Sequence, residues 1–140
     1  MVSQSDLVYA AALFDAVGYI NISQHNYLSS YVLLEYSGSF SHFHATWLQA
    51  NWGGYVSMPD PIVVSFRWRV RNAAAVTFVR QISPFVRFRN REVVLVLAYG
   101  SSPNQDRQEI ALKLKNLKVA IAKENSYAAV SVVQKRKSIR

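Results

Sequence analysis

The stretch from Ala10 to Ile22 constrains the fold of this chain more than any other. It opens with three alanines, which favour a helix, and it reaches Gly18, a residue that commonly ends one. The four residues after that glycine, YINI, alternate polar and apolar side chains as a half-buried strand does. The sequence therefore predicts a small-residue helix that passes directly into a strand.

Apolar periodicity and capping residues place the other elements. Capping-box spacing or a single capping side chain occurs at Ser3 with Asp6, Ser41, Asn72, Asn90, and Asp106 with Glu109. Helix ends are expected at Gly53 with Gly54, Pro84 and Gly100. We predict strands over residues 19–25, 31–37, 55–58 and 62–71, helices over 3–16, 41–52, 73–83, 90–99 and from 106 onward, and an extended link over 87–89. In the last helix, Ile110, Leu114, Leu117 and Ile121 line one stripe.

This order of elements predicts an α+β fold of the type αββαββα. A four-stranded antiparallel sheet is backed by helices on one face, and its other face is free to bind. One domain is expected for 140 residues of which 51% are hydrophobic. We assign residues 1–125 to that domain and residues 126–140 to a basic C-terminal extension.

Composition and motifs argue against several classes of protein. The absence of cysteine excludes disulfides, thiolate metal sites and cysteine nucleophiles. No apolar run approaches the roughly 20 residues that span a bilayer, so no membrane partner is expected. No P-loop, dinucleotide fingerprint or nucleophile elbow is present, and His42 and His44 lack the spacing of a helical zinc pair. We therefore expect no metal and no cofactor.

Charge is distributed very unevenly along the chain. Residues 1–66 contain four acidic residues and no Lys or Arg, a net charge of −4. Residues 67–140 contain all 16 basic residues and four acidic ones, a net charge of +12. Such a concentration of positive charge attracts polyanions, of which nucleic acid is the commonest. The start of the chain carries Asp6 and has no Lys or Arg before Arg67, unlike the basic start of a signal or transit peptide, so a protein of an organelle would be encoded there or trimmed.

The basic residues form clusters. Arg67, Arg69 and Arg71 alternate with apolar residues, so all three fall on one face of a β-strand. Neighbouring guanidiniums would lie about 7 Å apart, which is close to the spacing of phosphates along a single strand of nucleic acid. A face of solvated arginines would show the same alternation. We predict that nucleic acid is bound by Arg67, Arg69, Arg71, Arg87, Arg89, Arg91, Lys135, Arg136 and Lys137.

Several segments together resemble one family. The AAALFDAVG stretch that ends at Gly18 resembles the LAGLIDADG motif of homing endonucleases. Segments around Trp47, Trp52 to Val56, Phe66 to Arg69, Asn72 to Ala75 and Ile82 to Val86 follow in the order and spacing of that family, so the resemblance covers residues 5 to about 117.

The resemblance implies roles for the motif residues. In the family an acidic residue before the final glycine holds the cation that cuts DNA, and here that position is Val17. Asp15 falls where the family braces paired helices, and Arg89 falls on the basic residue near the scissile phosphate. With a single motif, a two-fold assembly requires a homodimer, whose helix pairing would use Ala11, Ala12, Asp15, Ala16 and Gly18.

The sequence thus predicts a catalytically inactive LAGLIDADG-type protein that binds nucleic acid. The resemblance implies basic residues on the first two strands in members that grip duplex DNA, and residues 19–37 have none. We therefore expect structured RNA in a ribonucleoprotein, such as the ribosome of a mitochondrion or chloroplast, with ribosomal neighbours as partners. A homodimeric DNA-binding homing endonuclease, or its degenerate descendant, and a maturase-type splicing cofactor remain alternatives, as does a bacterial or phage cytoplasm.

Overall fold

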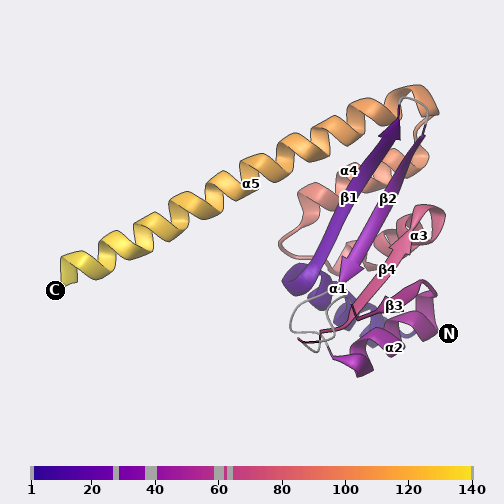
Figure 1. Ribbon diagram of the computed structural model, residues 1–140, viewed down its shortest axis with the longest axis horizontal. Coiled ribbons are helices and arrows are strands. Elements are labelled where there is room, and N and C mark those ends of the chain that lie inside the picture. The colour runs from indigo at the N-terminus through magenta and orange to yellow at the C-terminus, as the bar shows by residue number, and fades with distance from the viewer. Residues whose placement is uncertain (1, 27–28, 37–40, 59–61, 63–64, 140) are drawn as a thin grey trace.

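A computed structural model describes residues 2–26, 29–36, 41–58, 62 and 65–139. The chain runs through α1 (Gln4–Val17), β1 (Gly18–Asn26), β2 (Ser29–Tyr36), α2 (His42–Trp52), β3 (Tyr55–Ser57), β4 (Arg67–Arg71), α3 (Asn72–Ile82), a 3-10 turn η1 (Ser83–Phe85), α4 (Asn90–Ser101) and α5 (Asn104–Ile139) (Figure 1). The predicted order of helices and strands is confirmed, and so is the α+β class.

The four strands form one antiparallel sheet in the order β1-β2-β4-β3. Along β4, Trp68 and Val70 are buried, whereas Arg67 and Arg69 are half-buried and Arg71 is exposed. The predicted separation of an apolar face from an arginine face is therefore confirmed, because successive side chains of a strand point to opposite faces. The strand predicted over residues 62–71 begins at Arg67. Residues 62, 65 and 66 are not part of it, and residues 63–64 lie outside the described residues.

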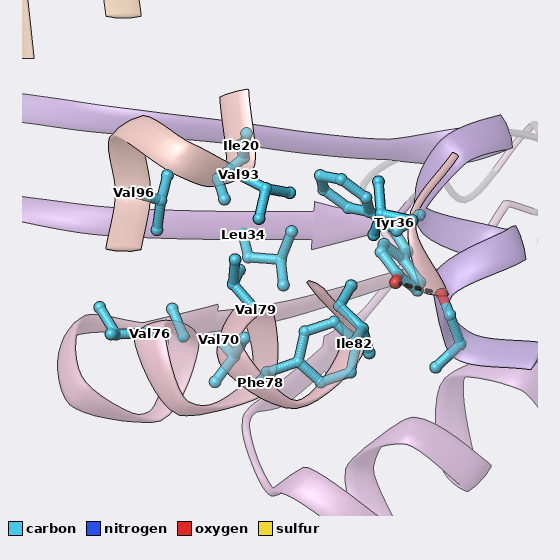
Figure 2. Close-up of a cluster of buried hydrophobic side chains, with 14 of the residues drawn as sticks. Ile20, Leu34, Tyr36, Val70, Val76, Phe78, Val79, Ile82, Val93 and Val96 are labelled. Atoms are coloured by element: carbon cyan, nitrogen blue, oxygen red, sulfur yellow. Dashed lines mark hydrogen bonds between the residues drawn. The ribbon is translucent and has the colours of Figure 1, made fainter. Parts of the chain in front are cut away.

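Helices cover the apolar face of the sheet and enclose the core (Figures 1 and 2). Tyr36, Trp68 and Phe78 are fully buried there and meet edge to face, with ring centroids 5.2 to 6.0 Å apart. The Tyr36 hydroxyl donates a hydrogen bond to the Ala10 carbonyl at 2.8 Å (Figure 2). Burial raises the pKa of Tyr36 well above its usual range, so this donor stays protonated and ties β2 to α1.

One glycine pair fixes the start of β3. Gly54 has a φ of +89°, and a Cβ there would lie 2.5 Å from the Arg69 carbonyl oxygen. Beside it, the Trp68 indole donates to the Gly53 carbonyl at 2.8 Å. The close passage of this turn over β4 therefore requires a residue without a side chain.

Two predicted caps are confirmed and three are wrong. Ser3 with Asp6 forms a capping box, and Ser41 caps α2 with His44 in the third position. At α3 and α4 the predicted caps Asn72 and Asn90 are instead the first helical residues, and the cap positions make no side-chain cap bond. The predicted Asp106 and Glu109 box is replaced by an earlier start, because α5 begins at Asn104 and the Asp106 amide donates to the Pro103 carbonyl at 3.0 Å.

The C-terminal part differs from the expected basic tail. Residues 134–137 belong to α5, a single helix of 36 residues that runs away from the rest of the molecule (Figure 1). Its first half packs against α4 and β1, with Leu114 fully buried. The sequence predicts an extended link over 87–89, but residues 87–88 form a bend. None of the described helices combines the length and apolarity needed to cross a bilayer.

Candidate nucleic-acid interface

The open face of the sheet presents the arginines of β4 beside one carboxylate. Register places Glu35 of β2 opposite Arg69, and the Arg69 guanidinium lies 2.6 Å from the Glu35 carboxylate. Arg67 lies 3.8 Å from the same carboxylate, and the two arginine side chains are 32% and 29% exposed. Glu35 therefore offsets part of the positive charge that the sequence assigned to this strand.

The neighbouring strands contribute uncharged side chains to the same face. Tyr19, Asn21 and Ser23 of β1 alternate with buried Ile20 and Ile22. On the other side of β4, Tyr55 of β3 pairs in register with Arg69 and is 66% exposed. The face thus combines guanidiniums with aromatic and hydroxyl groups, which can contact phosphates and bases respectively.

Arg89 makes its contacts within the protein. Its guanidinium donates to the Glu92 carboxylate at 3.0 and 2.8 Å and to the carbonyls of Phe14, at 2.9 Å, and Gly18. It also lies 4.4 Å from the centre of the Phe14 ring, and its side chain is only 19% exposed. Arg89 therefore joins the end of α1 to the start of α4, because it donates to carbonyls of Phe14 and Gly18 as well as to Glu92.

The two flanking arginines are exposed, unlike Arg89. The backbone amide of Arg87 donates to Asp15 at 2.9 Å, and the amide of Phe88 donates to the other oxygen of that carboxylate at 3.2 Å. Asp15 thus holds the backbone of the link while the side chain of Arg87 faces solvent.

Arg91 forms a bidentate pair with Glu124 of α5, at 3.2 and 3.0 Å. That hydrogen bonding raises the pKa of Arg91 and lowers the pKa of Glu124.

The motif helix has a buried side and an exposed side. Ala11 is buried, while Ala12 and Ala16 are exposed. Gly18 is required by close packing, since a Cβ there would lie 2.5 Å from the Phe14 ring. An apolar hollow of about 370 Å³ on the exposed side of α1 is lined by Val8, Ala12, Asp15, Ala16, Phe85, Arg87 and Phe88.

The residues at the end of α1 do not fit a divalent cation. The side chain of Val17 packs against the hydrophobic core and contains no oxygen. Both oxygens of Asp15 accept backbone amides, and both oxygens of Glu92 accept the Arg89 guanidinium. Hard cations such as Mg²⁺ need several oxygen ligands. Across the described residues, no group of three or more metal-binding side chains occurs.

Lys118 of α5 is a site residue that the sequence analysis did not single out. Its ammonium lies 3.9 Å from the centre of the Tyr19 ring and borders a cavity of about 600 Å³ that Glu92 and Glu124 also line. Burial lowers the pKa of Lys118 to about 8, against the opposing effect of Glu92. A signal was present, because Lys118 follows Leu114 by one helical turn and so lies beside the apolar stripe.

Comparison with known proteins identifies the fold. No family model and no curated protein matches the chain. The homing endonuclease I-CvuI, solved with its target, superposes with a TM-score of 0.66 and 23% identity over 81% of this chain and 82% of its own. The archaeal intron-encoded homing endonuclease I-Vdi141I, solved with DNA, superposes with a TM-score of 0.64 and 11% identity over 80% of this chain and 83% of its own. The LAGLIDADG homing endonuclease I-SmaMI, bound to cleaved DNA, superposes with a TM-score of 0.53 and 12% identity over 82% of this chain and 42% of its own.

This chain has the LAGLIDADG homing-endonuclease fold. Within that fold the predicted contact residues fall in three separate places. Arg67, Arg69 and Arg71 share the open face of the sheet, and residues 87, 89 and 91 lie where α1 meets α4. Residues 135–137 lie near the far end of α5, remote from both (Figure 1).

Proposed function

We propose that this protein binds nucleic acid on the open face of its sheet and does not cleave it. The observation that carries the proposal is the row formed by Arg67, Arg69 and Arg71 on the uncovered face of a LAGLIDADG fold. The solved structures of I-CvuI and I-Vdi141I contain the DNA that those proteins bind. Guanidiniums on a sheet can position a phosphate backbone.

The absence of cleavage is proposed from the chemistry at the end of α1. Metal-dependent phosphodiester cleavage needs carboxylates that hold a cation between the attacking and leaving oxygens. Val17 supplies none, and Asp15 and Glu92 are already bound to donors of the protein. The guanidinium of Arg89 pairs with Glu92 and so cannot act on a scissile phosphate without breaking that pair.

We propose that the nucleic acid bound by this protein is structured RNA. The positive charge of the open face lies on β4, whereas β1 contributes only Tyr19, Asn21 and Ser23 among its described side chains. An irregular RNA surface can be contacted over such a short patch, while a long duplex must be tracked across both halves of the sheet. We propose a ribonucleoprotein, such as an organelle ribosome, as the setting.

Competition binding tests this proposal. Folded RNA should outcompete duplex DNA of equal length at matched salt, and the triple change Arg67→Ala, Arg69→Ala and Arg71→Ala should weaken binding far more than Asn21→Ala with Ser23→Ala. Each phosphate contact that is lost should lower the salt slope of binding by about one unit. Tight binding to one duplex DNA sequence, abolished by the Asn21 and Ser23 changes, would replace RNA with DNA. Mg²⁺-dependent nicking by the purified protein would contradict the inactive site.

A homodimeric DNA-binding protein is the second candidate, and the surface of α1 favours it. Ala12 and Ala16 leave room for a second helix to approach closely, and Val8 and Phe88 extend the apolar area beside them. In this reading two open faces would together cover a two-fold symmetric duplex. Sedimentation of the free protein as a dimer that Ala16→Glu dissociates would support this candidate over the RNA-binding protomer.

A further inference from the structure

The helix α5 carries two apolar stripes on opposite sides. The first consists of Ile110, Leu114, Leu117 and Ile121, and it packs against the domain. At about 100° per residue, a second stripe lies roughly half a turn away from the first. Its members are Leu112, Val119, Ala122, Ala129, Val130 and Val133. The last member of the first stripe is Ile121, whereas the second stripe continues to Val133. The C-terminal half of α5 projects from the domain (Figure 1).

The second stripe is exposed. Leu112 is 55% exposed, and Val119, Val130 and Val133 are each between 51% and 54% exposed. Every described side chain from residue 122 to residue 137 belongs to the exposed class. Near its start the stripe borders a groove of about 540 Å³ between α5 and β1, lined by Leu112 and Val119 with Lys115, Tyr19, Asn21 and Ser23. The stripe therefore begins in a groove and continues along the helix.

The residue types of the projecting half favour a partner. Val130, Val132 and Val133 are β-branched, which lowers the helix propensity of the projecting half. Spacings of three and four residues separate Val119, Ala122, Ser126, Ala129 and Val133, the pattern that forms the seam between two packed helices. Helical structure here is consistent with packing against a second helix along that seam.

Charge decides between the possible occupants of the stripe. From residue 112 to residue 139, α5 has seven Lys or Arg and one acidic residue, a net charge of +6. A second copy of this helix would bring two such charges together, and like charges beside a seam oppose pairing. Nucleic acid matches the charge but makes no use of a stripe of alanine and valine side chains. An acidic partner helix matches both the charge and the apolar seam.

We propose that the second stripe of α5 is a docking site for an amphipathic helix of another protein, with an apolar seam flanked by acidic residues. The docked helix lies along Val119, Ala122, Ala129 and Val133. Its carboxylates lie beside Lys115 and Lys123 near one end of the seam and beside Lys137 near the other. This site is separate from the arginine row on β4, so it does not depend on the proposed nucleic-acid binding.

The test uses the full chain and a synthetic helical peptide about four heptads long, with Leu at the seam positions and Glu beside them. Fluorescence anisotropy should show binding of this peptide and binding at least about tenfold weaker for a peptide with Lys in place of Glu. Val133→Asp should weaken binding of the Glu peptide by about tenfold or more. Val132→Asp is the matched control, since Val132 is equally exposed and lies outside the stripe; it should change affinity by less than about threefold.

Other results would overturn the docking site. These are a Glu peptide that does not bind, equal affinity for both peptides, and equal effects of the two aspartate substitutions. Self-association that Val133→Asp removes and Val132→Asp preserves would assign the stripe to a second copy. Loss of RNA affinity with Val133→Asp alone would assign it to RNA. Circular dichroism of both variants distinguishes a lost contact from a lost helix.

Discussion

At the scale of single residues, the arginines of this chain differ in function although their local sequences are alike. Arg67 and Arg69 lie on the open face and share Glu35, while Arg89 is surrounded by backbone carbonyls and Glu92. Alternation along β4 is visible in the sequence, so the position of its arginines could be predicted. The contacts of Arg89 with Phe14 and Gly18 could not, because they join residues more than 70 positions apart in the chain.

Arg89→Ala is expected to destabilise the fold strongly. The change leaves the carboxylate of Glu92, which is 5% exposed, without its cation, and it removes the guanidinium donor from the carbonyls of Phe14 and Gly18. Breaking a buried pair in this way costs about 3–5 kcal/mol. Urea denaturation provides the measurement, with Arg87→Ala as the control, expected within about 0.5 kcal/mol of wild type because its side chain is exposed. Similar losses for the two variants would contradict the structural role of Arg89.

Lys118 is expected to make stability depend on pH. Burial depresses its pKa to about 8 in the folded protein, so between pH 8 and its usual value of 10.5 the unfolded chain binds more protons. Stability from this group therefore rises with pH across that window, and below pH 8 the charged ammonium costs stability. Because the side chain is partly exposed, we expect an effect of about 1 kcal/mol.

The measurement for Lys118 is the difference in unfolding free energy between wild type and Lys118→Met at pH 7 and near pH 10. Other titrating groups cancel in that difference. The variant should be relatively more stable at pH 7, and its advantage should shrink as pH rises. An advantage that grows with pH would mean that the pKa of Lys118 is raised instead.

At the scale of elements, the sequence predicts those whose signal is local. The order of helices and strands, the apolar stripe of α5 and the capping boxes at Ser3 and Ser41 follow from periodicity and spacing. The caps at Asn72 and Asn90 fail because α3 follows β4 without a loop, and because the Asn90 side chain donates back to the Arg87 carbonyl. The length of α5 is missed since its core-facing stripe ends at Ile121.

Trp68→Ala tests the assignment of faces in β4. The indole is fully buried between Tyr36 and Phe78, so its removal should cost about 3–5 kcal/mol. Arg69→Ala, one position away on the open face, loses a pair that is partly exposed to solvent, so it should cost about 1 kcal/mol or less. Thermal unfolding of the two variants is the comparison. A larger loss for the arginine change would reverse the two faces.

At the scale of the whole molecule, the difference in charge along the sequence becomes a difference in space. The uncharged strands β1 and β3 form the two edges of the sheet. Three arginines lie on β4, and further basic residues follow on α3, on the link before α4, on α4 and on α5. This asymmetry can be predicted from the sequence, because it requires only a count of the charged residues along the chain. It does not predict that Glu35 of β2 faces the arginines, since that depends on the register of two strands that a long stretch of chain separates.

Glu35→Gln is expected to strengthen nucleic-acid binding. The carboxylate lies 2.6 Å from Arg69 and 3.8 Å from Arg67, and it both competes with phosphate for these guanidiniums and repels it. The amide removes the charge at nearly constant shape, so affinity for folded RNA should rise several-fold at low salt and converge with wild type at high salt. Glu109→Gln is the matched control, because this carboxylate pairs with Lys113 on α5, and it should have a smaller effect. Weaker binding by Glu35→Gln would mean that Glu35 positions the arginines for their ligand, and the competition with phosphate would have to be abandoned.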